Sequence, residues 1–330
     1  MLSDRKKIGM TSWFCRSPTS GWLLPLGMGY ALTVPAAYNY GMTDLQILRK
    51  ELLATIRDYG SCAVAFSAGV DSTVVAKAAH LALGDDAIAV TADSPSLASG
   101  ELQDAKRLAA LIGIRHQIIG TQEIADPKYT ANNFDRCYYC KSELYTRMIG
   151  LTQDWGVNVL VNGANLDDQI DYRPGMRAAD ENSVRSPLIE AGIGKADVRR
   201  LAEAWQLPVW NKPAMPCLSS RVAYGVEVTS ERLRMIDQGE RWLKQRGWQE
   251  VRVRYHEGDL ARIEVPIEQL SALLKPDCQR ELVEALQQIG FRDVTVDLKG
   301  LRSGSLNSVI PVELIEINRS ENQAARKTDS

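Results

Sequence analysis

The sequence predicts an α/β protein in which a doubly wound parallel sheet is followed by a small α+β domain. Short apolar strands alternate with helical segments between residues 62 and 161, a pattern typical of a parallel sheet covered by helices on both faces. After Arg221 the pattern changes to one long amphipathic helix and then to a strand that alternates apolar and basic residues. The chain of 330 residues is long enough for about two domains.

The first predicted domain spans residues 42–221. It begins with a helix at 44–59, where the apolar residues Leu45, Ile47, Leu48, Leu52 and Ile56 are predicted to share one face. Strands are expected at 62–66, 87–92, 116–120 and 157–161. Helices are expected in the three intervals between them, at 73–83, 98–112 and 140–155. Ligands of such sheets bind beyond the carboxyl ends of the strands, so the candidate binding loops are 67–72, 91–96 and 162–168.

The second predicted domain spans residues 222–315. Thr229 or Ser230 caps a helix at 229–246. Strands are expected at 251–255, 260–265 and 294–298, and helices at 266–274 and 278–289. The polar residues 316–330 are predicted to form a disordered tail.

Residues 1–41 have no helical or strand period. Pro25 and Pro35 interrupt their apolar stretch, which argues against a signal peptide. We interpret this segment as an extension that is disordered or not translated, with Met42 as the start of the protein.

The composition excludes several classes of protein. The 39 basic and 41 acidic residues give a net charge of −2, which argues against a nucleic-acid partner. No apolar run reaches the roughly 18 residues of a membrane span, so no membrane partner is expected. The 6 cysteines are too few for a disulfide scaffold of this size, which favours a reducing compartment and a cytoplasmic location.

The turn Ser67-Ala68-Gly69-Val70-Asp71-Ser72 leads from the first strand directly into a helix. Small residues let backbone N–H groups approach an anion, and the helix N-terminus adds favourable partial charge. No Gly-Lys-Ser/Thr sequence closes this turn, so it is not a Walker A loop. We expect Ser67, Gly69, Asp71 and Ser72 to bind a nucleotide, the alternative being an ordinary strand-to-helix turn. A positive φ at the second position would strain Ala68.

Polar residues also follow the second and fourth strands. Asp93 is predicted either to meet the nucleotide or to cap the next helix. Gly163, Asn165 and Asp168 lie at the end of the fourth strand, where carboxylates and amides suit a Mg²⁺ ion that neutralises pyrophosphate. The alternative for this segment is a turn rich in Asn and Asp.

Cysteines stand in two motif-like contexts. Cys137 and Cys140 form a C-x-x-C that opens a helix late in the nucleotide domain, which disfavours a thioredoxin-like redox role. Cys217 follows Pro216 and precedes Arg221, a context that favours a reactive or metal-ligating thiol. Three cysteines suit a [4Fe–4S] cluster with one open iron. The alternative is that Cys137 and Cys140 are small buried hydrophobic residues.

Arginines of the second domain are candidates for phosphate recognition. Arg252 and Arg254 share one face of a strand by its period of two, and they can clamp a phosphate in bidentate fashion. Ser220 and Arg221 are predicted to help bind this phosphate. The alternative is a solvated strand face. Glu264, on the neighbouring strand, is predicted either to pair with these arginines or to act as a catalytic base.

The turn at 67–72 resembles the PP-loop of the ATP pyrophosphatases, Ser-Gly-Gly-x-Asp-Ser, with Ala68 in place of the first glycine. The chain as a whole closely resembles the LarE family of ATP-dependent sacrificial sulfur transferases over about residues 43–315. This resemblance depends on separated blocks at 67–72, 133–141, 163–175, 185–188, 212–221 and 300–307. It implies an adenine nucleotide α-hydrolase-like fold for the first domain.

The resemblance also implies a reaction. LarE enzymes adenylate the carboxylates of pyridinium-3,5-biscarboxylic acid mononucleotide with ATP, releasing pyrophosphate, and convert them to thiocarboxylates for the nickel-pincer nucleotide of lactate racemase. In the family, the cysteine at the position of Cys217 attacks the adenylate, and elimination from the thioester leaves dehydroalanine. Members with three cysteines, which Cys137, Cys140 and Cys217 match, are thought to recycle sulfide on a [4Fe–4S] cluster. Asp71 would serve adenylation.

The implied cofactors are therefore ATP, Mg²⁺ and, in the three-cysteine version, the [4Fe–4S] cluster. The implied partners are a small nucleotide substrate, further copies of the chain in a homo-oligomer, and other proteins of nickel-pincer cofactor biosynthesis. Two competing hypotheses are another PP-loop adenylating enzyme, a tRNA thiolase or an amide-forming synthetase, and a nucleotide-binding relic marked by Ala68. The near-neutral charge argues against tRNA, and no glutaminase-like segment supports the synthetase.

Overall fold

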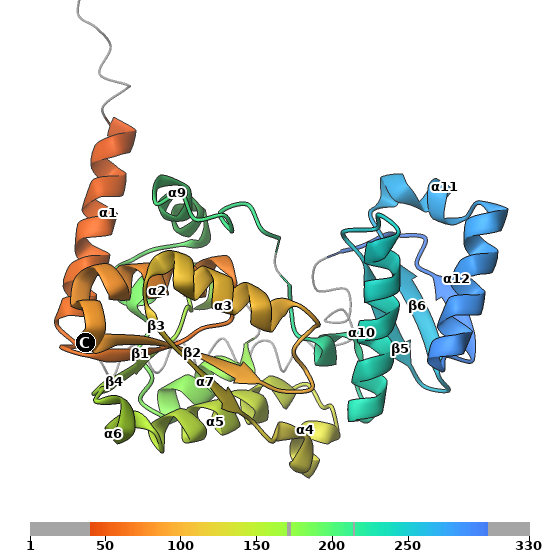
Figure 1. Ribbon diagram of the computed structural model, residues 1–330, viewed down its shortest axis with the longest axis horizontal. Helices are drawn as coiled ribbons and strands as arrows, with labels where there is room; N and C mark the ends of the chain where they lie inside the picture. Colours follow the sequence, from red (N-terminus) through yellow and green to blue (C-terminus); the bar gives the residue numbers. More distant parts are fainter. Residues whose placement is uncertain (1–39, 170–172, 214, 303–330) are drawn as a thin grey trace, which may run out of the picture.

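The computed structural model describes residues 40–169, 173–213 and 215–302 and contains two sheets (Figure 1). The first is a parallel sheet in the order β3-β2-β1-β4, which confirms the predicted α/β class. Its strands are β1 (Cys62–Ala65), β2 (Ala87–Asp93), β3 (Arg115–Gly120) and β4 (Val159–Val161). Each lies within a few residues of the range that its apolar run predicted.

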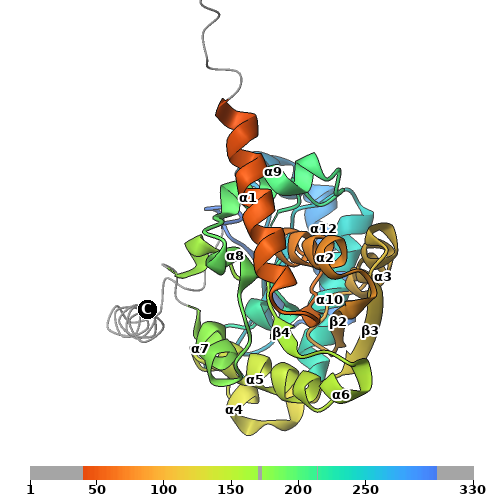
Figure 2. The ribbon, with the colours of Figure 1, turned by 90° about the vertical axis from the view of Figure 1, so that its left-hand side faces the viewer.

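Helices cover both faces of this sheet, as a doubly wound fold requires. Side chains alternate between the faces of a strand, so Cys62 and Val64 of β1 point to one side and Ala63 and Ala65 to the other. The first pair packs in one core with α1 (Tyr40–Arg57), α2 (Val70–Leu83), α3 (Glu101–Ile112) and α9 (Lys195–Ala204). The second pair packs with α5 (Arg136–Ile149) and α7 (Pro174–Glu181). Figure 2 shows α1 lying across α2 and close to α8 (Pro187–Glu190) and α9.

Several helices differ from the prediction. The helix expected at 140–155 begins earlier, at Arg136, and is divided into α5 and α6 (Thr152–Trp155) by the turn at Gly150 and Leu151. Helices α7, α8 and α9 were not predicted, nor was the short α4 (Pro127–Thr130). Proline stands at the first turn of α4, α7 and α8, a start signal that fixes φ without losing a needed N–H.

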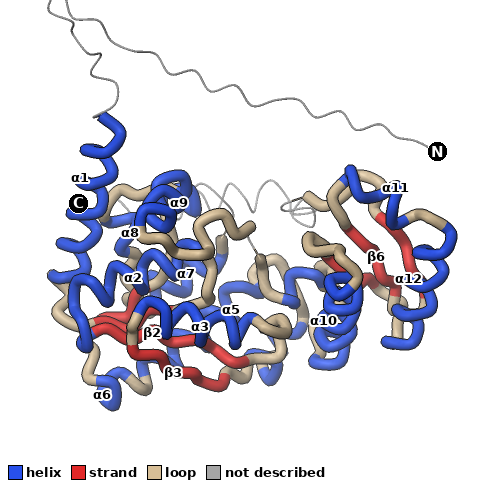
Figure 3. Tube along the Cα trace, turned by 45° about the horizontal axis from the view of Figure 1, so that its top comes forward, coloured by secondary structure: helices blue, strands red, loops and turns tan. Residues whose placement is uncertain are grey.

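The second sheet has the order β5-β6-β7, with β5 (Arg252–His256) antiparallel to β6 (Leu260–Glu264) and β7 (Asp293–Val296) parallel to β6. It packs in its own core with α10 (Ser230–Gln245), α11 (Leu270–Leu273) and α12 (Pro276–Ile289) (Figure 3). Thr229 is the N-cap of α10, as predicted, and its Oγ1 accepts a hydrogen bond of 3.2 Å from the Arg232 backbone N–H.

The interpretations of residues 1–39 and 303–330 lie outside the described residues, as do the parts of the resembling blocks at 170–172 and 303–307. The domain boundaries at 42–221 and 222–315 stay predictions. No helix in the described ranges has both the length and the apolar character needed to cross a membrane.

Candidate functional site

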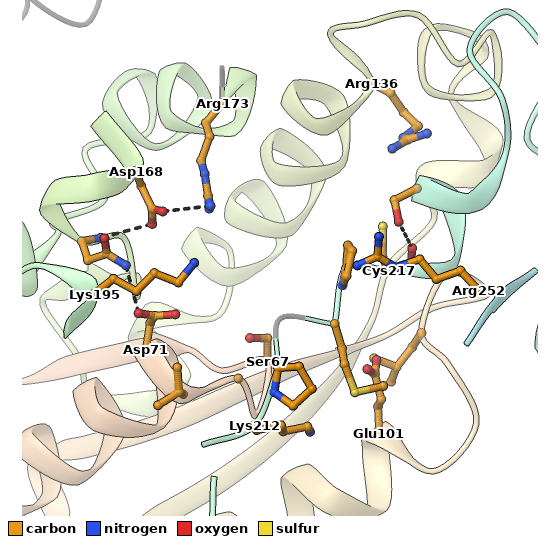
Figure 4. Close-up of a pocket in the computed structure, with 18 of the residues that line it drawn as sticks. Ser67, Asp71, Glu101, Arg136, Asp168, Arg173, Lys195, Lys212, Cys217 and Arg252 are labelled. Carbon is orange, nitrogen blue, oxygen red and sulfur yellow. Dashed lines mark hydrogen bonds and ion pairs between the residues drawn. The ribbon is translucent and has the colours of Figure 1, made fainter. Parts of the chain in front are cut away.

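A cavity of about 780 Å³ lies beyond the carboxyl ends of the parallel strands and is bordered by segments that follow those strands and by β5 of the second sheet (Figure 4). It brings together nine of the predicted site residues: Ser67, Gly69, Asp71, Asn165, Asp168, Cys217, Ser220, Arg252 and Arg254. These residues span almost 190 positions of the sequence, from Ser67 to Arg254. The first five come from the segments that follow β1 and β4, and the last four come from the segment around Cys217 and from β5.

The turn between β1 and α2 has a strained backbone that internal hydrogen bonds hold in place. Ala68 has a φ of +57° and is buried, so the strain expected for an alanine at this position is present. Ser72 does not line the cavity; its Oγ donates to the Gly69 carbonyl at 3.2 Å and accepts from the Ser67 backbone N–H at 3.3 Å. Ser72 therefore holds the loop in shape while Ser67 and Gly69 face the cavity.

Gly163 has a packing role that the sequence did not reveal. A Cβ atom at this position would lie 2.8 Å from the Ser72 backbone nitrogen and 3.1 Å from the Asp71 carbonyl carbon. The end of β4 thus approaches the start of α2 so closely that only glycine fits. Gly163 does not line the cavity, but it packs directly against the backbone of Asp71 and Ser72.

An acidic pair lies at one end of the cavity. Asn165 donates from Nδ2 to Asp71 Oδ1 at 2.9 Å, and its backbone N–H donates to Asp168 Oδ2 at 3.2 Å. Arg173 pairs with Asp168 at 2.8 Å. Burial raises the pKa of Asp168, and the charge of Asp71 raises it further, against the opposing effect of Arg173. Two carboxylates that repel each other beside an amide form a set that a cation would stabilise.

Asp93 does not line the cavity, although its strand ends nearby. The alternative prediction that it caps the next helix is wrong, because α3 begins at Glu101 with Gly100 as its N-cap. The loop after β2 is longer than the sequence interpretation assumed, which separates Asp93 from that helix.

Cys217 lies at the start of a short 3₁₀ helix, Leu218–Arg221, and is bonded into place from several sides. Its carbonyl accepts from Ser220 Oγ at 2.7 Å and from Arg221 Nη1 at 3.0 Å. The buried Arg221 guanidinium also pairs with the buried Glu240 at 2.9 Å and donates to the Pro216 carbonyl. Arg221 therefore positions the Cys217 segment and does not line the cavity, unlike the prediction.

Arg252 and Arg254 are 8% and 3% exposed, so the alternative of a solvated strand face is wrong. Arg254 donates to the Ser220 carbonyl at 2.8 Å and to Glu264 Oε2 at 2.9 Å. Burial lowers the pKa of Arg252, and the neighbouring Arg254 lowers it further. Such a concentration of buried positive charge is typical of a site for an anion.

Glu264 is fully buried and does not line the cavity. It pairs with Arg254 and, at 3.2 Å, with Arg262, so the prediction of arginine pairing is confirmed. The prediction that Glu264 acts as a base finds no support in this geometry.

The thiols of Cys137 and Cys140 lie outside the cavity lining but close enough to Cys217 to interact with it electrostatically. Cys137 is exposed and Cys140 is half-buried. Burial raises the pKa of Cys140 to about 12, and Cys217 is the next cause. The described residues contain no group of three His, Cys, Asp or Glu side chains arranged to hold a single metal ion.

The sequence interpretation missed several lining residues: Glu101, Arg136, Lys195, Arg199, Lys212 and Tyr224. Glu101 and Arg136 are the first residues of α3 and α5, and Lys195 and Arg199 belong to the unpredicted α9. Burial raises the pKa of Glu101 against the opposing charge of Lys212. Arg136 and Lys212 lie in two of the resembling blocks, 133–141 and 212–221, which was the available signal for these two residues.

No protein-family model matches the chain. The chain is 49% identical over 247 residues to an uncharacterized protein of Synechocystis, covering 75% of this chain and 92% of that protein. It is 36% identical over 270 residues to the pyridinium-3,5-bisthiocarboxylic acid mononucleotide synthase of Lactiplantibacillus plantarum, covering 82% and 97%. It is also 26% identical over 240 residues to an uncharacterized protein of Methanocaldococcus jannaschii, covering 73% and 90%. The chain therefore belongs to the LarE family, the family of pyridinium-3,5-bisthiocarboxylic acid mononucleotide synthase.

Proposed function

We propose that this protein is an enzyme of sulfur transfer in the synthesis of pyridinium-3,5-bisthiocarboxylic acid mononucleotide, and that it activates its substrate with ATP. One observation carries the proposal: a single cavity is lined by the loop at 67–72, by Cys217 and by buried arginines. The site that activates the carboxylate with ATP and the thiol must share one cavity, so that the activated carboxylate reacts with sulfur before it reacts with water. The 36% identity to the synthase supports the same substrate class.

Adenylation would use the first side of the cavity. Ser67, Gly69 and the N-terminus of α2 line the region where ATP phosphates would bind. Asp71, Asn165 and Asp168 suit a Mg²⁺ ion, which would neutralise the departing pyrophosphate. A substrate carboxylate oxygen attacks the α-phosphorus, the bond to the β-phosphate oxygen breaks, and the acyl adenylate remains.

Sulfur transfer would use the second side. Cys217 Sγ attacks the acyl carbon, AMP leaves, and a thioester forms. Removal of the Cys217 Cα proton then breaks the Cβ–Sγ bond and leaves a thiocarboxylate and dehydroalanine. Glu101 is the better candidate for this base than Glu264, because it lines the same part of the cavity as Cys217 (Figure 4). Burial raises the pKa of Glu101, which suits a carboxylate that must accept a proton.

Cys137, Cys140 and Cys217 would be the ligands if the protein carries a [4Fe–4S] cluster. The raised pKa of Cys140, in part an effect of Cys217, fits thiols gathered in one place. Such a cluster would supply an open iron able to hold sulfide. The phosphate of the substrate would meet Arg252 and Arg254, with Ser220 beside them.

The test is pyrophosphate release with ATP and the biscarboxylate mononucleotide, together with the mass of the product, for the wild type and for Cys217→Ser. We expect the variant to release pyrophosphate but to form no thiocarboxylate. Cys278→Ser, on α12 and away from the cavity, is the matched control and should behave as the wild type. Unchanged thiocarboxylate formation by Cys217→Ser would refute the role of this thiol. Iron and acid-labile sulfide in protein purified without oxygen would distinguish a cluster from a cysteine that is used once.

A further inference from the structure

Arg136 is a buried cation at the cavity that the proposed reaction does not yet use. It is the first residue of α5 and is 4% exposed. Its Nη1 donates to the Ser219 carbonyl at 2.7 Å and to Asn132 Oδ1. These two bonds hold the guanidinium beside the segment of Cys217, toward which it points in Figure 4.

The guanidinium has no carboxylate partner among the described residues. The neighbouring buried arginines differ in this respect, because Arg221 pairs with Glu240 and Arg254 with Glu264, each at 2.9 Å. A buried charge without a counter-charge is unfavourable unless an anion from outside completes it. Arg136 is therefore a candidate to bind the anionic part of a ligand.

The remaining donors of Arg136 are available to such a ligand. Neither Nε nor Nη2 has a hydrogen-bond acceptor in the described part of the protein, and neither is among the atoms enclosed without a partner. Because Arg136 lines the cavity, a ligand bound there can reach the guanidinium. Nε and one Nη form the edge of a guanidinium that binds a planar carboxylate through two parallel hydrogen bonds.

The charge of Arg136 persists despite its burial. A guanidinium is not deprotonated in folded proteins, so Arg136 remains a cation. Its hydrogen bond to the Ser219 carbonyl, two residues after Cys217, places the guanidinium near the sulfur that would react. An anion bound by Arg136 would consequently lie beside Cys217, whereas the phosphate has Arg252 and Arg254.

We propose that Arg136 binds the carboxylate of the substrate that is not reacting, while the other carboxylate is activated and meets Cys217. This inference rests on the proposed function, because only a substrate with two carboxylates leaves one of them free. After the first conversion, the thiocarboxylate takes its place on Arg136 with the same charge and planar shape. Arg136 thereby selects a pyridinium mononucleotide with two carboxylates over one with a single carboxylate.

The experiment compares pyrophosphate release from ATP with two substrates, the biscarboxylate mononucleotide and nicotinic acid mononucleotide, which has one carboxylate. Wild type, Arg136→Met and Arg136→Lys are compared. The control is Arg177→Met, an exposed arginine on α7 that stacks on Tyr138 and does not line the cavity. Thermal melting checks that each variant folds, and Arg136→Lys retains a donor for the Ser219 carbonyl.

We expect Arg136→Met to lower kcat/KM for the biscarboxylate by about tenfold to 100-fold, as a lost charged hydrogen-bond pair predicts. The value for the monocarboxylate should stay unchanged, so the preference between the substrates disappears. Arg136→Lys should retain part of the preference and Arg177→Met all of it. An equal loss with both substrates, or an unchanged preference, would overturn the assignment. A wild type inactive with the biscarboxylate would instead reject the proposed function, and the inference with it.

Discussion

Gly163→Ala tests the close contact between the end of β4 and the proposed ATP-binding loop at 67–72. The added Cβ would lie 2.8 Å from the Ser72 nitrogen, 3.0 Å from its Cα and 3.1 Å from the Asp71 carbonyl carbon. All three are backbone atoms, so no side chain can rotate away and the start of α2 must move. Forcing an atom into a packed site of this kind costs about 1–3 kcal/mol.

Two measurements follow from that displacement. In thermal melting, Tm should fall by about 2–4 °C for each kcal/mol. In calorimetric titration with ATP, affinity should fall about tenfold for each 1.4 kcal/mol of binding free energy that is lost through the displaced loop. Gly120→Ala is the matched control: Gly120 ends the strand β3, and its added Cβ would meet no atom within 4 Å. If both variants melt alike and bind ATP alike, the contact at Gly163 does not support the loop.

Three further perturbations test other parts of the site. Iodoacetamide at pH 8 should alkylate the exposed Cys137 before Cys140, whose pKa burial raises to about 12; peptide mass spectrometry that finds Cys140 modified first would contradict this order. Glu264→Gln should lower the free energy of unfolding by about 3–5 kcal/mol in urea titrations, because it leaves the buried Arg254 without its carboxylate; a loss below about 1 kcal/mol would reject the pairing as a structural support. Glu101→Gln should stabilise the ligand-free protein at pH values above the ordinary carboxyl pKa and not at lower pH. Burial raises the folded-state pKa of Glu101, so the wild type loses stability as pH rises and this group ionises, whereas glutamine does not ionise. Tm measured from pH 4 to pH 8 checks this, and a constant difference between the proteins would argue against ionisation as its cause.

The sequence predicted the parallel sheet well because its strands carry the signal themselves. β1, β2 and β4 are short and largely buried apolar runs, whereas in the edge strand β3 only Ile119 is buried. The small-residue turn after β1 marks the start of α2. The break at Gly150 was missed because the sequence on both sides of it continues a helical pattern. Helices α7 to α9 were missed because they are short and are stabilised by packing against elements distant in the sequence.

The site was predictable where chemistry and strand position coincide, as at Asp71 and Asn165. It was less predictable where burial decides a role. Arg221, Arg254 and Glu264 have the composition of a solvated face, and only the fold reveals that they are enclosed ion pairs. Arg136 lies in the resembling block 133–141, but the sequence assigned no role to it, because that role depends on the absence of a carboxylate partner among the described residues.

The Cys217 segment is tied to both parts of the molecule. The Leu218 backbone N–H donates to the Ser96 carbonyl at 2.9 Å, in the loop after β2, while Arg221 pairs with Glu240 of α10. The segment that carries the thiol is thus fixed by contacts to the loop after β2 and to α10. A change that shifts one sheet relative to the other would therefore move the Cys217 sulfur while leaving the loop at 67–72 intact.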